Sequence, residues 1–130
     1  MKYLLDTNVI SEPLKRRPAA PVMRRLTEQA HMCAVCAPVW HELAYGIARH
    51  PHPDRKRYLE ELRANLQILP YDQRAADWHA EERARLERAG KTPSFVDGMI
   101  AAVSASNGLV LVTRNLKHFR QFRGLEVERW

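Results

Sequence analysis

The sequence predicts an α/β protein, a three-layer α/β/α sandwich with a central parallel sheet. Three observations lead to this prediction: short apolar runs typical of buried strands, longer segments with helical spacing between them, and short connections. Strands that alternate with helices favour parallel pairing, with helices covering both faces of the sheet. The length of 130 residues, 45% of them hydrophobic, suits a single domain over residues 1–130 with one core.

The first half of the chain contains two predicted strands and three predicted helices. Pro13 breaks a short helix, whereas Pro21 occupies the first turn of a longer one. Val39, Leu43 and Ile47 follow the i, i+4 spacing of one helix face. In chain order, the elements are a strand over Lys2–Leu5, helices over Asn8–Leu14 and Pro21–Ala30, a strand over His31–Ala37 and a helix over Pro38–Arg49.

The second half contains three predicted helices and three predicted strands. After the stretch HPHPD, Asp54 is expected to cap a helix, and Gly90 is expected to end a later one. β-Branched and apolar residues favour a strand near Val110, and an edge strand is expected close to Trp130. In chain order, these elements are a helix over Asp54–Leu66, a strand over Ile68–Tyr71, helices over Asp72–Ala89 and Ser94–Asn107, and strands over Leu109–Thr113 and Leu125–Arg129.

Three carboxylates occupy apolar surroundings. Asp6 follows the first strand, at the end where ligands bind to such sheets. Glu42 lies in an otherwise apolar helix, and Asp97 is the only charge between Lys91 and Arg114. Because a carboxylate in apolar surroundings is costly unless a cation compensates it, the three acids predict one shared cation. Taken alone, Asp6 is also consistent with a helix cap, Glu42 with an exposed helix face and Asp97 with an arginine partner.

The overall charge favours a polyanionic partner. Lys and Arg number 21 against 15 Asp and Glu, which gives a net charge of +6. Any single basic cluster is also consistent with a solvated helix face. No segment predicts a membrane span, and the apolar start is too short for a secretory signal, so the expected location is cytoplasmic.

Two further motifs suggest other chemistry. Cys33 and Cys36 form a lone C-x-x-C, which we interpret as packed, reduced thiols in a strand, with a redox protein as the alternative. The stretch HELAY begins like a zinc protease motif but has Tyr45 where the second histidine is required, which excludes that class.

Four motifs in order, LLDTNVISEP, PVWHELAYGI, FVDGMIAA and VLVTRNLKHF, resemble those of the PIN-domain ribonucleases and, within them, the VapC-type toxins. The resemblance implies a PIN-like fold and metal-dependent endoribonuclease activity. It assigns Asp6 and Asp97 as principal ligands of Mg²⁺ or Mn²⁺, with Glu42 as a ligand directly or through water. The implied supporting residues are Thr7, Asn8, Thr113, Asn115 and His118. The residues expected to contact RNA phosphates are Arg114, Lys117 and Arg120.

One departure from the family pattern leaves an alternative open. Family members commonly carry a fourth acid at the place of Asn115 or His118, and neither is acidic here. We therefore expect one metal ion. An imidazole ligand from His118 would favour Mn²⁺ as that ion. The alternative function is a catalytically weak or inactive module that binds nucleic acid or an antitoxin.

The resemblance also implies two protein partners. VapC-type toxins pair with a small antitoxin, VapB-like, whose carboxyl-terminal segment covers the active-site groove. They usually form homodimers, for which the helices over Asp72–Ala89 and Asp54–Leu66 are candidate surfaces.

Overall fold

A five-stranded, all-parallel sheet forms the centre of the molecule, with strand order β3-β2-β1-β4-β5. The computed structural model describes residues 1–130. The strands are β1 (Tyr3–Leu5), β2 (Cys33–Cys36), β3 (Gln67–Leu69), β4 (Val110–Val112) and β5 (Glu126–Glu128). Every strand pairs in register with its neighbour, as in the alignment of Tyr3 with both Cys33 and Val110.

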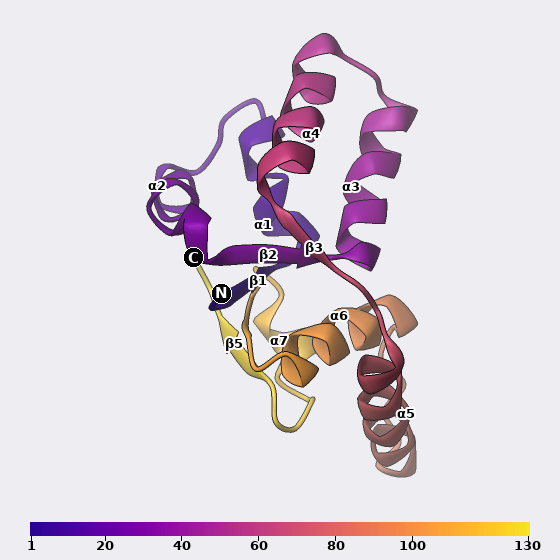
Figure 1. Cartoon of the computed structure of the whole chain (residues 1–130). Helices are drawn as coiled ribbons and strands as arrows, with labels where there is room; N and C mark the ends of the chain where they lie inside the picture. Colours follow the sequence, from indigo (N-terminus) through magenta and orange to yellow (C-terminus); the bar gives the residue numbers. More distant parts are fainter.

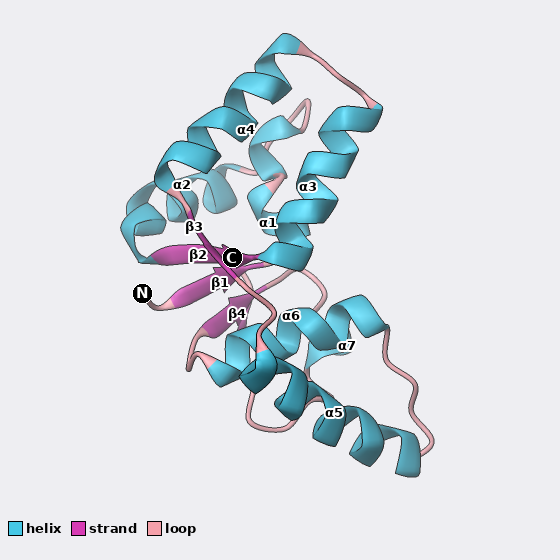
Figure 2. Ribbon diagram, turned by 45° about the vertical axis from the view of Figure 1, so that its right-hand side comes forward, coloured by secondary structure: helices cyan, strands magenta, loops and turns pink.

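Helices cover both faces of this sheet. The α-helices are α1 (Thr7–Ile10), α2 (Ala20–Gln29), α3 (Ala37–Arg49), α4 (Pro53–Asn65), α5 (Gln73–Arg88), α6 (Phe95–Ser106) and α7 (Leu116–Phe119). Two 3₁₀ turns, η1 (Glu12–Leu14) and η2 (Ala30–Met32), lie at either end of α2. Figures 1 and 2 show α1 to α4 on one side of the sheet and α5 to α7 on the other. The predicted three-layer α/β/α sandwich is confirmed.

The core lies on both faces of the central strands. All of β1 and β2 is buried, and so are Ile100, Ala101 and Val103 of α6. Strands covered on both faces are apolar along their whole length, which explains why the sequences of β1 and β2 show no alternation. At the ends of the chain, the rings of Tyr3 and Trp130 meet edge to face, with centroids 5.2 Å apart.

Three local predictions need correction. The predicted helix over Asn8–Leu14 is divided at Ser11 into α1 and η1. Asp54 does not cap α4, because His52 is the N-cap and its Nδ1 accepts a hydrogen bond from the Asp54 backbone N–H. The stretch TRNLKHF, for which the resemblance to the family implies a turn, contains the short helix α7. The other predicted elements differ from the structure by one to three residues at their ends, where helix capping begins or sheet pairing stops, and four of them start one residue earlier than predicted.

The order of the strands determines where a ligand can bind. The chain passes from β1 to β2 and β3 on one side, and then returns to β4 and β5 on the other. This reversal at β1 is a topological switch point, and in open parallel sheets ligands bind beyond the carboxyl ends of the strands at such a point. Asp6 directly follows β1, and Thr113 directly follows the adjacent strand β4. None of the helices is both long and apolar enough to cross a membrane.

Candidate functional site

Asp6 lies at the switch point, and hydrogen bonds hold both its backbone and its carboxylate. Its backbone N–H donates to the carbonyl of Val112 (2.9 Å), which extends the pairing of β1 with β4. Its carboxylate accepts from the Thr7 backbone N–H (2.8 Å) and from the Thr113 hydroxyl (2.7 Å). Only 6% of Asp6 is exposed. The carboxylate is therefore fixed in a mostly buried position at the edge of the sheet.

Glu42 reaches the same place from helix α3. The Thr7 hydroxyl donates to Glu42 Oε2 (2.8 Å), while the Thr7 backbone N–H donates to Asp6. Thr7 thus connects two acids that lie on different elements. Helix α3 begins directly after β2, so its start is also at the carboxyl edge of the sheet.

Asp97 approaches from the first turn of α6, on the other side of the sheet. Its backbone N–H donates to the Ser94 hydroxyl, which caps the helix (3.3 Å). Its side chain is 29% exposed, and one carboxylate oxygen lies 4.0 Å from Nδ1 of His118. The helix cap therefore fixes the backbone of Asp97 and leaves its carboxylate open to solvent.

The pKa values of Asp6 and Asp97 are both raised, in part by the charges of the neighbouring acids. Burial raises the pKa of Asp6, the hydrogen bonds from Thr113 and Thr7 lower it, and the charges of Asp97 and Glu42 raise it further. Burial also raises the pKa of Asp97, against a lowering by His118, and the charge of Glu42 adds to the rise. Each of these two carboxylates is therefore less favourable in its charged form than it would be alone.

The donor chemistry of the three acids fits a divalent cation. No three side chains among His, Cys, Asp and Glu are close enough to form a metal-ligand cluster as they stand. The three acids nevertheless supply the hard oxygen ligands that Mg²⁺ and Mn²⁺ prefer. A cation between them would also remove the mutual repulsion that raises the pKa of Asp6 and Asp97. The residues present thus fit the predicted ion.

Two pockets contain candidate acids, one lined by no hydrophobic residue and one lined by both polar and apolar side chains. One, about 400 Å³ in volume, has no hydrophobic lining residue and contains Asp97, His118, Lys91 and Gln121. The other, about 220 Å³, contains Glu42, with the guanidinium-bearing residue Arg55 at its wall. Together they provide space for an extended polar ligand beside the carboxylates.

The supporting residues and the basic residues fall into two groups, one held by hydrogen bonds within the protein and one exposed. Thr113 is fully buried, and its hydroxyl also accepts a hydrogen bond from the Asn115 backbone N–H (3.0 Å). Asn8 Oδ1 accepts from the Arg114 backbone N–H (3.2 Å). By contrast, Asn115, His118, Lys117 and Arg120 are exposed.

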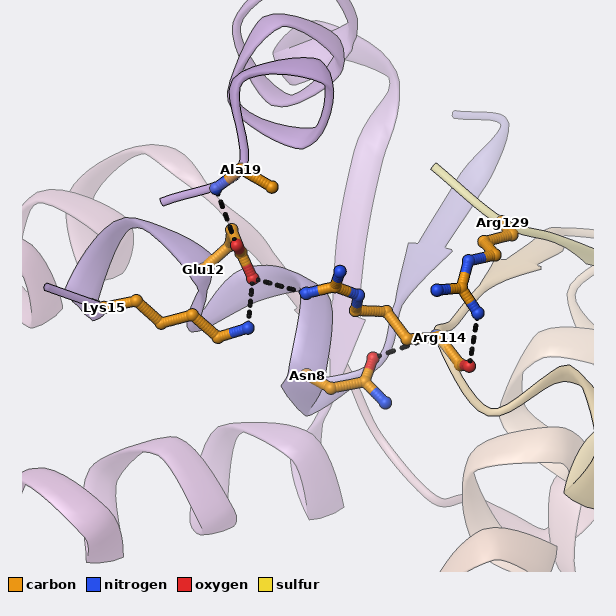
Figure 3. Close-up of polar contacts among 6 residues, drawn as sticks. All are labelled: Asn8, Glu12, Lys15, Ala19, Arg114 and Arg129. Atoms are coloured by element: carbon orange, nitrogen blue, oxygen red, sulfur yellow. Dashed lines mark hydrogen bonds and ion pairs between the residues drawn. The ribbon is translucent and has the colours of Figure 1, made fainter. Parts of the chain in front are cut away.

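Sequence reasoning missed Glu12, which is 1% exposed although it is charged. Its carboxylate accepts from the Ala19 backbone N–H (2.8 Å), Lys15 Nζ (2.8 Å) and Arg114 Nη1 (3.0 Å), as Figure 3 shows. Arg114, predicted to contact RNA, is therefore turned towards a buried acid. The available signal was a second acid in the opening motif, followed by proline and then by Lys15.

An apolar cavity of about 320 Å³ lies between α2 and α4, apart from the acids. Nine of its twelve lining residues are hydrophobic, among them Met23, Leu26, Leu62 and Leu66. At its wall, the Tyr58 hydroxyl donates to the carbonyl of Ile10 (2.6 Å). Since this cavity offers little to bind a charged ligand, it is suited to an apolar segment.

The two cysteines are free and buried, as the packed-thiol interpretation predicts. Burial raises the pKa of Cys33 to about 11 and that of Cys36 to about 12, so both remain protonated at neutral pH. We expect the native protein to react with Ellman's reagent at pH 8 at least about tenfold more slowly than the urea-unfolded chain, because the thiolate is the nucleophile. Equal absorbance time courses for the two states would contradict the interpretation.

Comparisons with known proteins find relatives over the whole length of the chain. A family model described as PIN domain matches residues 3–125. The tRNA(fMet)-specific endonuclease VapC of Shigella flexneri is 34% identical over 131 residues, which cover 100% of this chain and 98% of the relative. Toxin FitB of Neisseria gonorrhoeae is 33% identical and covers 89% of both chains.

Solved structures of similar proteins superpose on nearly the whole chain. The structure of VapBC2 from Rickettsia felis, bound to a DNA fragment from its promoter, superposes with a TM-score of 0.87 at 26% identity. That match covers 100% of this chain and 99% of the solved chain. The structure of FitAcB from Neisseria gonorrhoeae has a TM-score of 0.83 at 32% identity, and covers 96% and 95% of the two chains.

Proposed function

Because the chain belongs to the PIN-domain family, among its VapC-type toxin ribonucleases, we propose that it hydrolyses RNA phosphodiester bonds at a divalent metal ion held by Asp6, Asp97 and Glu42. The observation that supports the proposal is that Thr7 hydrogen-bonds both Asp6 and Glu42 at the switch point of the sheet, where the charge of Asp97 also acts on Asp6. When bound, Mg²⁺ or Mn²⁺ supplies an activated water and neutralises charge on the phosphate.

The chain's own residues prepare the site for this chemistry. Thr113 and Thr7 each donate to one oxygen of Asp6, so the direction of that carboxylate is set before an ion binds. The Thr7 hydroxyl orients Glu42, which acts as a ligand directly or through a water molecule. We infer one ion rather than two, because Asn115 and His118 stand where the family has a fourth acid. His118, close to Asp97, favours Mn²⁺.

Exposed basic residues beside the acids are suited to hold the RNA backbone. Lys117 and Arg120 are exposed on and after α7, next to the pocket that contains Asp97 and His118. Lys91 and Gln121 line the same pocket and add donors for phosphate or ribose oxygens. Contacts of this kind position the substrate without selecting its sequence.

The partner is a small antitoxin, as in the VapBC and FitAB complexes that this chain resembles. We propose that an apolar helical segment of the antitoxin binds in the cavity between α2 and α4, while its carboxyl-terminal segment covers the acids. The hydrophobic lining supports this occupant. Homodimerisation through α5 or α4 stays a prediction.

Cleavage of a defined RNA by the purified chain, freed of antitoxin, tests the function. The first substrate is an initiator tRNA transcript, with an elongator tRNA as the comparison, because one relative is a tRNA(fMet)-specific endonuclease. We expect cleavage with Mn²⁺ or Mg²⁺, its loss in EDTA and its return when the ion is restored. Cleavage that persists in EDTA would contradict the proposal. Antitoxin binding without any cleavage would favour the inactive module, which the lack of a fourth acid allows.

Introducing a charge into the apolar cavity should weaken antitoxin binding. Leu26 lines the cavity, so Leu26→Glu would bury a carboxylate against apolar side chains, and we expect Kd to rise at least about tenfold. Arg24→Glu places the same residue at an exposed position of α2 and is the matched control. Isothermal titration calorimetry with the antitoxin measures both. An equal effect of the two variants would show that overall charge, and not the cavity, determines binding.

A further inference from the structure

Glu12 carries a charge in a place where no solvent can stabilise it. It lies in η1, is 1% exposed, and its two carboxylate oxygens accept hydrogen bonds from Ala19, Lys15 and Arg114 (Figure 3). The hydrogen bonds from Lys15 and from the Ala19 backbone hold the pKa of Glu12 below its ordinary value, against the effect of burial. The carboxylate is therefore charged at neutral pH and fully partnered.

The partners of Glu12 differ in what they connect. Lys15 is three residues away, and its side chain is 48% exposed. Ala19 N–H lies at the start of α2, where no side chain caps the helix. Arg114 is 102 residues away and belongs to the loop that follows β4. Only the contact with Arg114 ties Glu12 to the catalytic edge of the sheet.

Arg114 is fixed at three points. Its guanidinium donates to Glu12, its backbone N–H donates to Asn8 Oδ1, and its carbonyl accepts from Arg129 Nη1 (3.1 Å). Figure 3 shows these contacts around one residue. The residue before it, Thr113, donates to Asp6. These contacts hold the backbone and the side chain of Arg114 beside the hydroxyl that orients Asp6.

We propose that Glu12 and Arg114 form a positioning pair, which holds the loop Thr113–Asn115 against Asp6. The proposal rests on the proposed function, since it gives Arg114 a role in aligning the metal ligand in place of the predicted contact with RNA. The buried acid holds the guanidinium at 3.0 Å, with the Arg114 side chain only 29% exposed, and this contact holds the loop. The Thr113 hydroxyl accepts a hydrogen bond from the Asn115 backbone N–H and donates one to Asp6, so the three residues form one continuous chain of hydrogen bonds.

The test compares Arg114→Ala with Lys15→Ala. Lys15 forms the other ion pair of Glu12, at 2.8 Å, but it contacts no residue of the loop. The first measurement needs no catalysis: hydrogen exchange of the Asn115 amide, followed by NMR in the full-length protein without metal. We expect exchange at least about tenfold faster in Arg114→Ala and a change below about twofold in Lys15→Ala, because only the first variant frees the loop.

Metal binding and kinetics provide the second measurement. In Arg114→Ala we expect Mn²⁺, titrated by electron paramagnetic resonance, to bind about fivefold or more weakly, and kcat to fall about tenfold or more, with KM for RNA within about twofold. Arg114→Lys keeps the charge and should recover part of kcat. A rise in KM with unchanged kcat would assign Arg114 to RNA contact and overturn the proposal. So would unchanged exchange at Asn115.

Further measurements decide the two cases in which Arg114→Ala does not fold or the wild-type protein does not cleave RNA. If Arg114→Ala does not fold, Glu12→Gln keeps the size and the hydrogen-bonding oxygen while removing the charge, and faster Asn115 exchange is again the expected result. If the wild-type protein cleaves no RNA, the proposed function fails, whereas the exchange and Mn²⁺ measurements still decide whether the pair positions the loop.

Discussion

Asp97→Asn should lower the rate of RNA cleavage by about 100-fold or more at saturating Mn²⁺, the largest loss that we expect from one nearly isosteric change. The substitution removes one negative ligand while keeping the size of the side chain. The backbone N–H of residue 97 can still donate to Ser94, so the helix cap persists. The loss of activity would therefore report on charge at the site and not on the fold of α6.

The same variant should be more stable than the wild-type protein when no metal is present. Folding raises the pKa of Asp97, so the folded chain binds this proton more tightly than the unfolded chain does. The charged carboxylate therefore destabilises the fold at neutral pH. This cost decreases as the pH falls through the raised pKa and disappears below the ordinary value of 3.8. The stability gain of Asp97→Asn should follow the same pH dependence.

Both effects are measured on one set of proteins. Initial rates on a tRNA transcript give the activity, and urea unfolding in EDTA at several pH values gives the stability. Asp77→Asn removes an exposed acid of α5 and serves as the control, with little change expected in either measurement. Cleavage by Asp97→Asn at a rate close to that of the wild-type protein would show that Asp97 is not a metal ligand.

Predictions from sequence succeeded where periodicity and strand order determine the result. Once β1 and β4 are predicted as parallel strands, their carboxyl ends must lie at one edge, which brings Asp6 and Thr113 together. The patterns of α3 and α6 also place Glu42 in the second turn of one helix and Asp97 in the first turn of the other. The neighbouring positions of Asp6 and Thr113 thus follow from local patterns and one topological rule.

Sequence reasoning failed where a side chain depends on a distant partner. Glu12 is adjacent to a proline in a polar-looking segment, and its burial becomes favourable only through Arg114. His79 of α5 is 3% exposed, and its Nδ1 lies 2.8 Å from the Tyr71 hydroxyl, a partner that the sequence did not indicate. Neither contact follows from spacing along the chain, because each requires the packed positions of other elements.

The contact between His79 and Gly98 leads to the second large prediction, that Gly98→Ala destabilises the protein. A Cβ at position 98 would overlap the imidazole of His79, with Cδ2 at 2.7 Å and Cε1 at 2.9 Å. The ring cannot easily move away, because Tyr71 holds one nitrogen and Phe95 packs on its face, with centroids 4.9 Å apart. Alanine is the better helix former by about 1 kcal/mol. We expect an overpacking cost of about 2 to 3 kcal/mol, which exceeds that gain.

Gly46→Ala is the control, because it gains the helix propensity of alanine without the cost of overpacking. No atom lies within 4 Å of a Cβ at Gly46, so this variant should be stabilised by about 0.5 to 1 kcal/mol in urea unfolding. A Gly98→Ala variant as stable as Gly46→Ala would show that α5 and α6 are not closely packed at this point.

If α6 instead shifts to relieve the overlap, Asp97 shifts with it, because Asp97 and Gly98 are adjacent. Gly98→Ala should then also weaken Mn²⁺ binding, which Gly46→Ala should leave unchanged, and this difference would link the packing of α5 on α6 to the alignment of the metal ligand.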